Sequence, residues 1–204
     1  MTTALKKPYH HGDLRRALIV AGTELLKEGG AAALDLRKVA RKAGVSHAAP
    51  YRHFEDKRAL LAAIAEEGFA RLTDQLKSVP ADLPPKERLQ GLIRVYVDFA
   101  LTEPALMREM FSGLTIDRMA YPDLHASSKI GLGLLVETVE RGQASGAFVP
   151  GDPVNLALVM WAMFHGLAML LLENQMPMIT QEPNGVEEMI QRCVASLYDG
   201  LRPR

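Results

Sequence analysis

Residues 35–58, DLRKVARKAGVSHAAPYRHFEDKR, constrain the fold more than any other part of this chain. Asp35 is placed to cap a first helix, because its carboxylate can accept hydrogen bonds from the free N–H groups of the first turn. Gly44 then ends that helix, since a residue without a Cβ readily adopts positive φ. Ser46 is placed as a second N-cap and predicts a second helix over residues 47–54. Two short helices joined by a tight turn that contains glycine form a helix-turn-helix.

Several residues in and around this stretch match a known pattern. They are Ala40, the turn Ala43-Gly44-Val45-Ser46, Tyr51, His53, Phe54, Lys57, Leu60 and Leu61. On these residues, positions 14–61 closely resemble the DNA-binding domain of the tetracycline-repressor (TetR/AcrR) family of transcription regulators. The chain departs from the family at residues 48–50, Ala-Ala-Pro, where the family often has Gly-Thr or Gly-Ser and then an aliphatic residue. Because Pro50 lacks an N–H and clashes with the carbonyl four residues earlier, we expect a distorted entry to the second helix.

The resemblance implies that the second helix enters the major groove of a double-stranded DNA operator. We hypothesise that four residues face the bases and that five others position the DNA backbone. The predicted base-facing residues are Ser46, His47, Ala48 and Pro50, and the predicted backbone-positioning residues are Asp35, Arg37, Tyr51, His53 and Lys57. Tyr51 belongs to the second set because the matching residue of the family commonly touches the phosphate backbone.

The formal net charge of the chain is zero, but the charges are unevenly distributed. Residues 1–58 contain 12 Lys and Arg against 6 Asp and Glu, whereas residues 59–204 contain 12 against 18. A basic first quarter suggests contact with a polyanion, although an ordinary solvated face could carry the same charge. Residues 1–12 are expected to form either a basic arm that reaches phosphates or a minor groove, or a solvated tail.

The chain is predicted to be all-α, because no alternation of period two appears and proline and glycine separate helical patterns. Asp13 and Asp56 are expected to cap helices, and Gly29-Gly30 to end the first of them. The predicted helices after the helix-turn-helix cover, approximately, residues 57–79, 86–101, 103–111, 123–143, 154–173 and 184–201. The predicted domains are a DNA-binding domain, residues 1–56, and a ligand-binding and dimerisation domain, residues 57–204.

Residues 154–172 are nineteen residues without a formal charge, which is long enough to span a membrane. The flanking charges are acidic, at Asp152 and Glu173, and no Lys or Arg occurs between Arg141 and Arg192. A positive-inside anchor is therefore missing, and we expect a buried helix of a cytoplasmic protein rather than a membrane span. The resemblance implies that residues 154–173 and 184–201 form the interface of a homodimer.

Nine of the ten methionines follow residue 106, in apolar helices that also carry aromatic residues. Methionine is flexible and suits an adaptable cavity. For any single methionine, however, simple filling of the core is the plainer explanation. We hypothesise a pocket for a small, mostly apolar effector, lined by Phe99, Met107, Met110, Phe111, Trp161 and His165. His165 is either a polar anchor for the ligand, with Tyr96, or a buried and hydrogen-bonded core residue. Trp161 with His165-Gly166 resembles a Trp-His-Gly motif found in one branch of the family.

An enzyme and a membrane or structural helical protein are the alternative classes. The candidate catalytic residues His125, His165 and Cys193 have no partner at a recognisable spacing, and the sequence contains no phosphate-binding glycine loop. We therefore predict no enzyme activity and no cofactor. His10 and His11 have no further ligand at metal-binding spacing, so no metal site is expected either. The single cysteine excludes an intrachain disulfide and suits a reducing cytoplasm.

Overall fold

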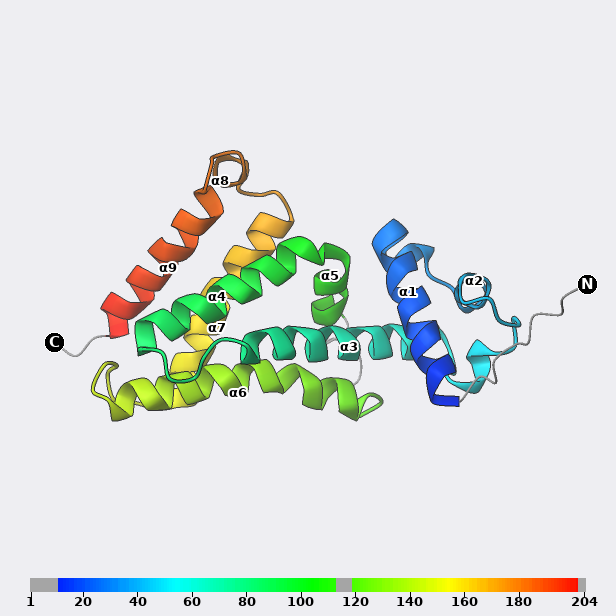
Figure 1. The fold of residues 1–204 in the computed structure, drawn as a ribbon, viewed down its shortest axis with the longest axis horizontal. Coiled ribbons are helices and arrows are strands. Elements are labelled where there is room, and N and C mark those ends of the chain that lie inside the picture. The colour runs from blue at the N-terminus through cyan, green and yellow to red at the C-terminus, as the bar shows by residue number, and fades with distance from the viewer. Residues whose placement is uncertain (1–10, 113–118, 202–204) are drawn as a thin grey trace, which may run out of the picture.

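The computed structural model of the protein describes residues 11–112 and 119–201. Within these ranges the chain forms α-helices and one short 3-10 helix, which confirms the predicted all-α fold (Figure 1). The elements are α1 (His11–Ala33), α2 (Leu36–Lys42), η1 (Pro50–Arg52), α3 (Lys57–Lys77), α4 (Pro85–Thr102), α5 (Pro104–Ser112), α6 (Pro122–Ala144), α7 (Pro153–Leu172), α8 (Pro177–Thr180) and α9 (Gly185–Leu201). Most of the expected N-terminal arm, residues 1–10, lies outside the described residues.

Proline begins the helices α4, α5, α6, α7 and α8. The first N–H groups of a helix have no partner within it, so proline loses no hydrogen bond there and its fixed φ suits the first turn. The helices predicted over residues 86–101, 123–143 and 154–173 start after a proline, and the observed helices α4, α6 and α7 begin one residue earlier, at that proline. The short helix α8 lies between Pro177 and Pro183, where the sequence predicts a loop.

Two glycines interrupt α1 near its C-terminal end, as predicted. Gly29 has φ −154° and ψ 19°, and Gly30 has φ 67°, so the helical backbone is broken at this pair and resumes for one short turn. A positive φ is strained for residues that carry a Cβ, which explains the glycine at position 30. The break lets the chain fold back from α1 into α2.

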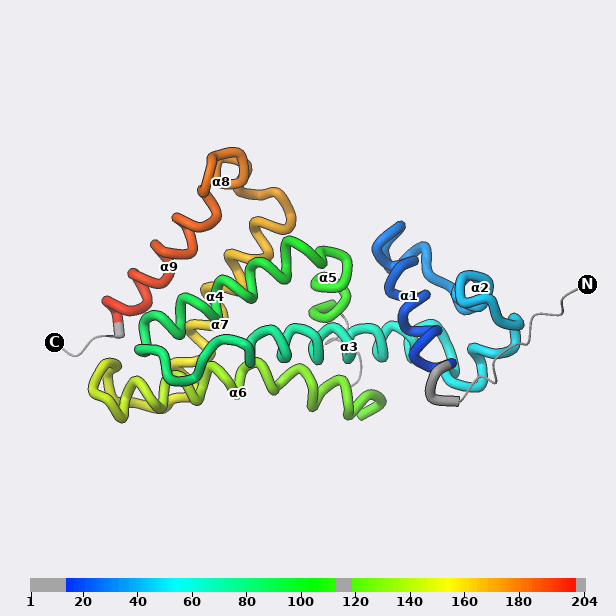
Figure 2. Tube along the Cα trace, in the orientation of Figure 1, coloured from blue at the N-terminus to red at the C-terminus, as the bar shows by residue number. Residues whose placement is uncertain are grey.

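The long helix α3 connects the two parts of the molecule (Figures 1 and 2). Its N-terminal half packs against α1, and Leu60 and Ile64 have no exposed surface there. Its C-terminal half runs alongside α6 and below α5, within the group of helices α4–α9. We call α1, α2, residues 43–56 and the N-terminal half of α3, where the sequence predicts DNA contacts, the DNA-binding unit, and the remaining helices with the C-terminal half of α3 the body.

The apolar helix α7 packs against α4 and α6 in the body. Its length and mean hydropathy of 1.8 would suit a membrane span, and one third of its most apolar window, 33%, is buried in the structure. Ala157, Met160 and Phe164 belong to its buried face. It is therefore a partly buried core helix, and its second face is not covered by the other described helices of this chain.

Candidate nucleic-acid interface and ligand cavity

The N-terminus of α2 is capped as the sequence predicts. The Asp35 carboxylate accepts hydrogen bonds from the backbone N–H groups of Arg37, at 2.7 Å, and Lys38, at 3.0 Å. The hydrogen bond from the Lys38 N–H, followed by that from Arg37, lowers the pKa of Asp35 below its ordinary value. Gly44 follows the helix with φ +68°, which confirms the predicted glycine turn. The first half of the helix-turn-helix is thus fixed by local chemistry alone.

The second half differs from the prediction, because residues 47–54 do not form an α-helix. The N–H of Ala49 donates to the Ser46 carbonyl at 3.0 Å, and the N–H of His53 donates to the Pro50 carbonyl at 2.9 Å. Both bonds span three residues, and only Pro50–Arg52 forms a short 3-10 helix. Ser46 therefore does not cap an α-helix. Pro50 has no N–H to donate to the carbonyl four residues earlier, so an α-helical ladder cannot cross this position.

The predicted DNA-contacting residues are mostly accessible. Ser46, His47 and Ala48 are exposed, as are Asp35 and Arg37, whereas His53 and Lys57 are half-buried. Tyr51 is 54% exposed, whereas Phe54 is buried, so one aromatic side chain of this segment is accessible on the surface. Pro50 is buried, and its predicted base-facing role is incompatible with that position.

Contacts from α1 hold this surface in place. The Arg15 guanidinium lies 5.7 Å from the centre of the Phe54 ring, a cation–π contact that ties α1 to the end of the 47–54 segment. Lys42, at the end of α2, pairs with Glu24 at 3.2 Å and Glu28 at 2.7 Å, both on α1. The hydrogen bond to Glu28 raises the pKa of Lys42, which stays charged but is turned back toward α1.

A cavity of ≈ 290 Å³ lies within the body, between α3, α4, α5, α6 and α7. Its walls are mainly apolar and aromatic. The lining residues are Phe69, Leu72, Thr73 and Leu76 of α3, Leu92 and Tyr96 of α4, Phe111 of α5, His125, Ser128, Lys129, Gly131, Leu132 and Leu135 of α6, and Trp161 and Phe164 of α7. The described part of the chain thus contains a cavity whose size is near the lower end of the range for small-molecule sites.

Two of the six predicted ligand-contacting residues, Phe111 and Trp161, line this cavity. His165 lies immediately behind them, because its ring is 4.4 Å from that of Phe111 and 5.2 Å from that of Trp161, centre to centre. The three others are core residues: Phe99 is 1% exposed, and Met107 and Met110 are 0% exposed. These side chains pack α4 and α5 onto α3 and leave no surface for a ligand. Phe99, Met107 and Met110 therefore fill the core and do not line the cavity.

A polar pair is embedded in the apolar wall of the cavity. The Tyr96 hydroxyl and Nδ1 of His165 are 2.7 Å apart, a hydrogen bond between α4 and α7. Burial raises the pKa of Tyr96 and lowers the pKa of His165, because both charged forms lose hydration there. Both groups are therefore neutral near pH 7. His165 is thus hydrogen-bonded, as one of its two predicted roles requires, and Tyr96 is the member of the pair that lines the cavity.

The contribution of α6 to the cavity was missed by the sequence analysis. His125, Ser128, Lys129, Leu132 and Leu135 lie at intervals of three, one, three and three residues, so one face of α6 carries them all. This spacing was available in the sequence. It was overlooked because the polar residues of this face resemble an ordinary solvated surface rather than a cavity wall.

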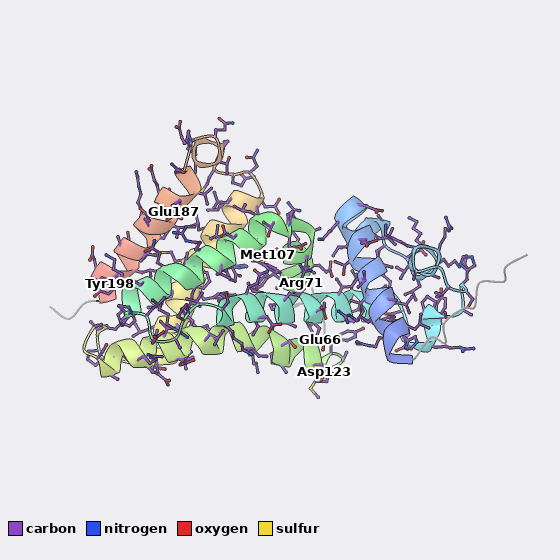
Figure 3. All side chains as sticks on the ribbon, in the orientation of Figure 1. Glu66, Arg71, Met107, Asp123, Glu187 and Tyr198 are labelled. Atoms are coloured by element: carbon purple, nitrogen blue, oxygen red, sulfur yellow. The ribbon has the colours of Figure 1, made fainter. Side chains whose placement is uncertain are left out.

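A salt bridge joins the body to the DNA-binding unit near the cavity. Glu103, between α4 and α5, pairs with Lys27 of α1 at 2.7 Å and with Arg71 of α3 at 2.6 Å. Figure 3 places Arg71 where α3 passes close to α5. Burial alone would raise the pKa of Glu103, but the hydrogen bonds from Lys27 and Arg71 lower it below its ordinary value. One carboxylate therefore links three elements that belong to both parts of the molecule.

A capped helix and turn near the N-terminus, joined by one continuous helix to a helical body, is the architecture of a class of DNA-binding transcription regulators. Residues 18–64 match the family "Bacterial regulatory proteins, tetR family", and residues 89–197 match "Tetracyclin repressor-like, C-terminal domain". The chain belongs to the TetR family of transcriptional regulators. This membership confirms the prediction of a regulator rather than an enzyme. The finer resemblance to the Trp-His-Gly branch stays a prediction.

Individual relatives agree with this family. The HTH-type transcriptional regulator BetI of Rhizobium meliloti (strain 1021) is 34% identical over 82 residues, which are 40% of this chain and 40% of that protein. The tetracycline repressor protein class D of Escherichia coli is 45% identical over 67 residues, 33% of this chain and 30% of that protein. The chain thus aligns with well under half the length of these curated relatives.

The similarity to solved structures covers nearly the whole chain. A protein with unknown function from Rhodococcus sp. RHA1 is 37% identical, with a TM-score of 0.84 over 97% of this chain and 100% of that one. A bacterial regulatory protein in the tetR family from Rhodococcus RHA1 is 18% identical, with a TM-score of 0.70 over 94% and 98% of the two chains. At that identity the second comparison supports the fold alone.

Proposed function

We propose that this protein is a cytoplasmic, ligand-responsive repressor that binds a palindromic operator as a homodimer and is released by a small, mostly apolar effector. The observation that carries the proposal is the course of α3. Its N-terminal half belongs to the DNA-binding unit, and Phe69, Leu72 and Leu76 of its C-terminal half line the cavity. A ligand in the cavity therefore touches the same helix that supports the DNA-binding surface. Repression is the sign suggested by the similarity to the tetracycline repressor protein class D of Escherichia coli.

In this proposal the exposed residues Ser46, His47 and Ala48 face the bases, and Pro50 is left out because it is buried. Asp35, Arg37, Tyr51, His53 and Lys57 form the set that positions the DNA backbone. Asp35 acts indirectly, since its carboxylate holds the N-terminus of α2. Contacts to phosphates fix the register of a protein on DNA, and contacts to base edges in the major groove supply sequence preference.

The uncovered face of α7 supports dimerisation through residues 154–173, together with residues 184–201. Its large exposed apolar side chains are Val154 at 45%, Leu158 at 39%, Val159 at 62%, Met163 at 39% and Leu170 at 47% exposure. Contiguous apolar surface of this kind marks interaction sites, and a two-fold partner would cover it with the same helices. A dimer also matches a palindromic operator, whose half-sites lie about 34–36 Å apart or at a multiple of this distance.

The experiment that tests the proposal selects bound sequences from a pool of random duplexes and measures their affinity at increasing salt concentrations. A palindromic sequence should be enriched, and its affinity should fall steeply with salt, since each neutralised phosphate contributes about −0.9 to the log–log slope. His47→Ala should change the preferred sequence, whereas Lys57→Ala should weaken all sequences alike. Enrichment of no sequence, or full affinity in a folded variant with Ser46, His47 and Tyr51 all changed to Ala or Gly, would contradict the proposal.

A further inference from the structure

The charges around the cavity are unbalanced. Among its lining residues, Lys129 is the one side chain with a formal positive charge, and the described lining contains no Asp or Glu. The remaining wall is apolar apart from Thr73, Ser128, Tyr96 and the imidazole of His125. The described lining therefore offers the Lys129 ammonium group to a ligand and no carboxylate.

Most arginines of the body are already engaged by other side chains, whereas Lys129, among the described residues, is not. Arg71, Arg94 and Arg108 pair with Glu103, Glu187 and Glu173. Arg88 is buried and donates to the Thr138 hydroxyl, and Arg192 lies near Glu188. In the described parts of the chain, by contrast, Lys129 enters no salt bridge. Its ammonium group is thus available to a ligand.

The position of Lys129 on α6 determines which part of a ligand it would meet. Lys129 lines the cavity and is also exposed to solvent, so we place its ammonium group at the solvent side of the cavity; the neighbouring Ser128 hydroxyl donates to the His125 carbonyl at 2.9 Å. Phe111 and Trp161, contributed by α5 and α7, form an aromatic wall of the same cavity. A lysine stem can lie along an apolar wall while its charged end stays hydrated.

We infer that the effector is a compact organic anion, an apolar body with one carboxylate or similar acidic group, and that Lys129 is its charge-recognising residue. The acidic group pairs with Lys129 at the mouth, and the apolar body packs against Trp161 and Phe111. The volume of ≈ 290 Å³ favours a small acid over a long-chain amphiphile. The inference rests on the proposed function, because it gives a chemical class to the effector of the same cavity.

The sole tryptophan of the chain, Trp161, lines the cavity and supplies a direct readout of occupancy. The experiment titrates tryptophan fluorescence of the full chain with cyclohexylbutyrate and with its neutral isostere cyclohexylbutyramide, neither of which absorbs where tryptophan does. The acid should bind about tenfold more tightly than the amide, which is the effect of one charge-assisted hydrogen bond at a partly hydrated site. Lys129→Met should abolish this preference without weakening the amide, and Lys129→Arg should restore it.

Lys77→Met is the matched control, because Lys77 is exposed on the neighbouring helix α3, does not line the cavity and forms no salt bridge within the described residues. It removes the same charge and should leave the preference for the acid unchanged. Equal binding of acid and amide to the unchanged protein would overturn the inference and leave the apolar effector of the proposed function standing. A loss of preference in Lys77→Met as large as in Lys129→Met would overturn the role of Lys129. If neither probe perturbed Trp161 at millimolar concentration, both the inference and the proposed effector cavity would be contradicted.

Discussion

The two halves of α3 are packed in different ways. In the N-terminal half, Leu60 and Ile64 are 0% exposed, and a Cβ on Gly22 of α1 would lie only 2.8 Å from Cδ1 of Ile64. In the C-terminal half, Leu72 and Leu76 are buried but face a cavity of ≈ 290 Å³. One helix thus passes from a close-packed region into a region with empty space.

This difference bears on how a signal could travel along the protein. Close-packed interiors resist deformation and move as units, whereas side chains around a cavity can rearrange when it is filled. A ligand would therefore change the packing of the C-terminal half of α3, and the N-terminal half would carry the displacement into the DNA-binding unit without absorbing it. The following predictions test whether the two halves behave as differently as their packing indicates.

The largest expected effect is on the free energy of unfolding. Leu60→Ala should lower it by about 4 kcal/mol, because the close-packed surroundings cannot collapse around the missing atoms. Leu76→Ala should lower it by about 2 kcal/mol, since Leu76 already borders empty space and the same substitution forfeits fewer contacts. Urea denaturation followed by circular dichroism measures both values. Equal losses would show that the two halves of α3 are packed alike.

A smaller effect is expected where the body meets the DNA-binding unit. Glu103→Gln removes the charge that Lys27 and Arg71 share while keeping the size of the side chain. Because both partners are partly exposed, the unfolding free energy should fall by only about 1 kcal/mol. The ability of a ligand to release DNA should fall more clearly, since one of the contacts that join the two parts, beside α3, is lost. Glu173→Gln, which breaks the pair with Arg108 inside the body, is the control and should leave DNA release intact.

The smallest expected effect is the contribution of His165, beside the cavity, to the pH dependence of the free energy of unfolding. Burial lowers the folded-state pKa of His165 below its unfolded value, so the unfolded chain binds the proton more readily. The stability contributed by neutral His165 is therefore present above about pH 6.5, the unfolded value, and is lost as the pH falls through the lowered folded value. Thermal melts between pH 7.5 and 5 should show a shallower decline for His165→Gln than for the unchanged protein. Parallel declines would mean that His165 does not contribute to this dependence.

The sequence predicted most helices and two of their four N-caps, because these depend on local chemistry; α1 begins at His11, so Asp13 is not its N-cap, and Ser46 caps no α-helix. Asp35 and Asp56 cap α2 and α3 through their own side chains, and Gly44 adopts the positive φ expected of a glycine turn. The predicted α-helix over residues 47–54 was wrong for an equally local reason. Pro50 was recognised as unusual, but its missing N–H was expected to distort the helix rather than replace it with successive turns.

The cavity was less predictable, because its walls come from five helices that are distant in the sequence. Residue type alone cannot separate Met107, which is completely buried in the core, from Phe111, which is four residues further and lines the cavity. The direction of each side chain is set by how α5 lies on α3, and no local pattern fixes that contact. The face of α6 that carries Lys129 was visible as a spacing, yet only its position beside α3 identifies it as a cavity wall.

The central claim is that occupation of the cavity and binding of DNA are linked through α3. Thermodynamic linkage is reciprocal. If the ligand weakens the binding of operator DNA by a given factor, operator DNA must weaken the binding of the ligand by the same factor. Isothermal titration calorimetry of one ligand, with the protein alone and with the protein saturated with its operator duplex, measures this directly. We predict weaker ligand binding to the DNA complex, by about 5- to 150-fold, which corresponds to a coupling of about 1–3 kcal/mol. Identical affinities in the two titrations would contradict the claim.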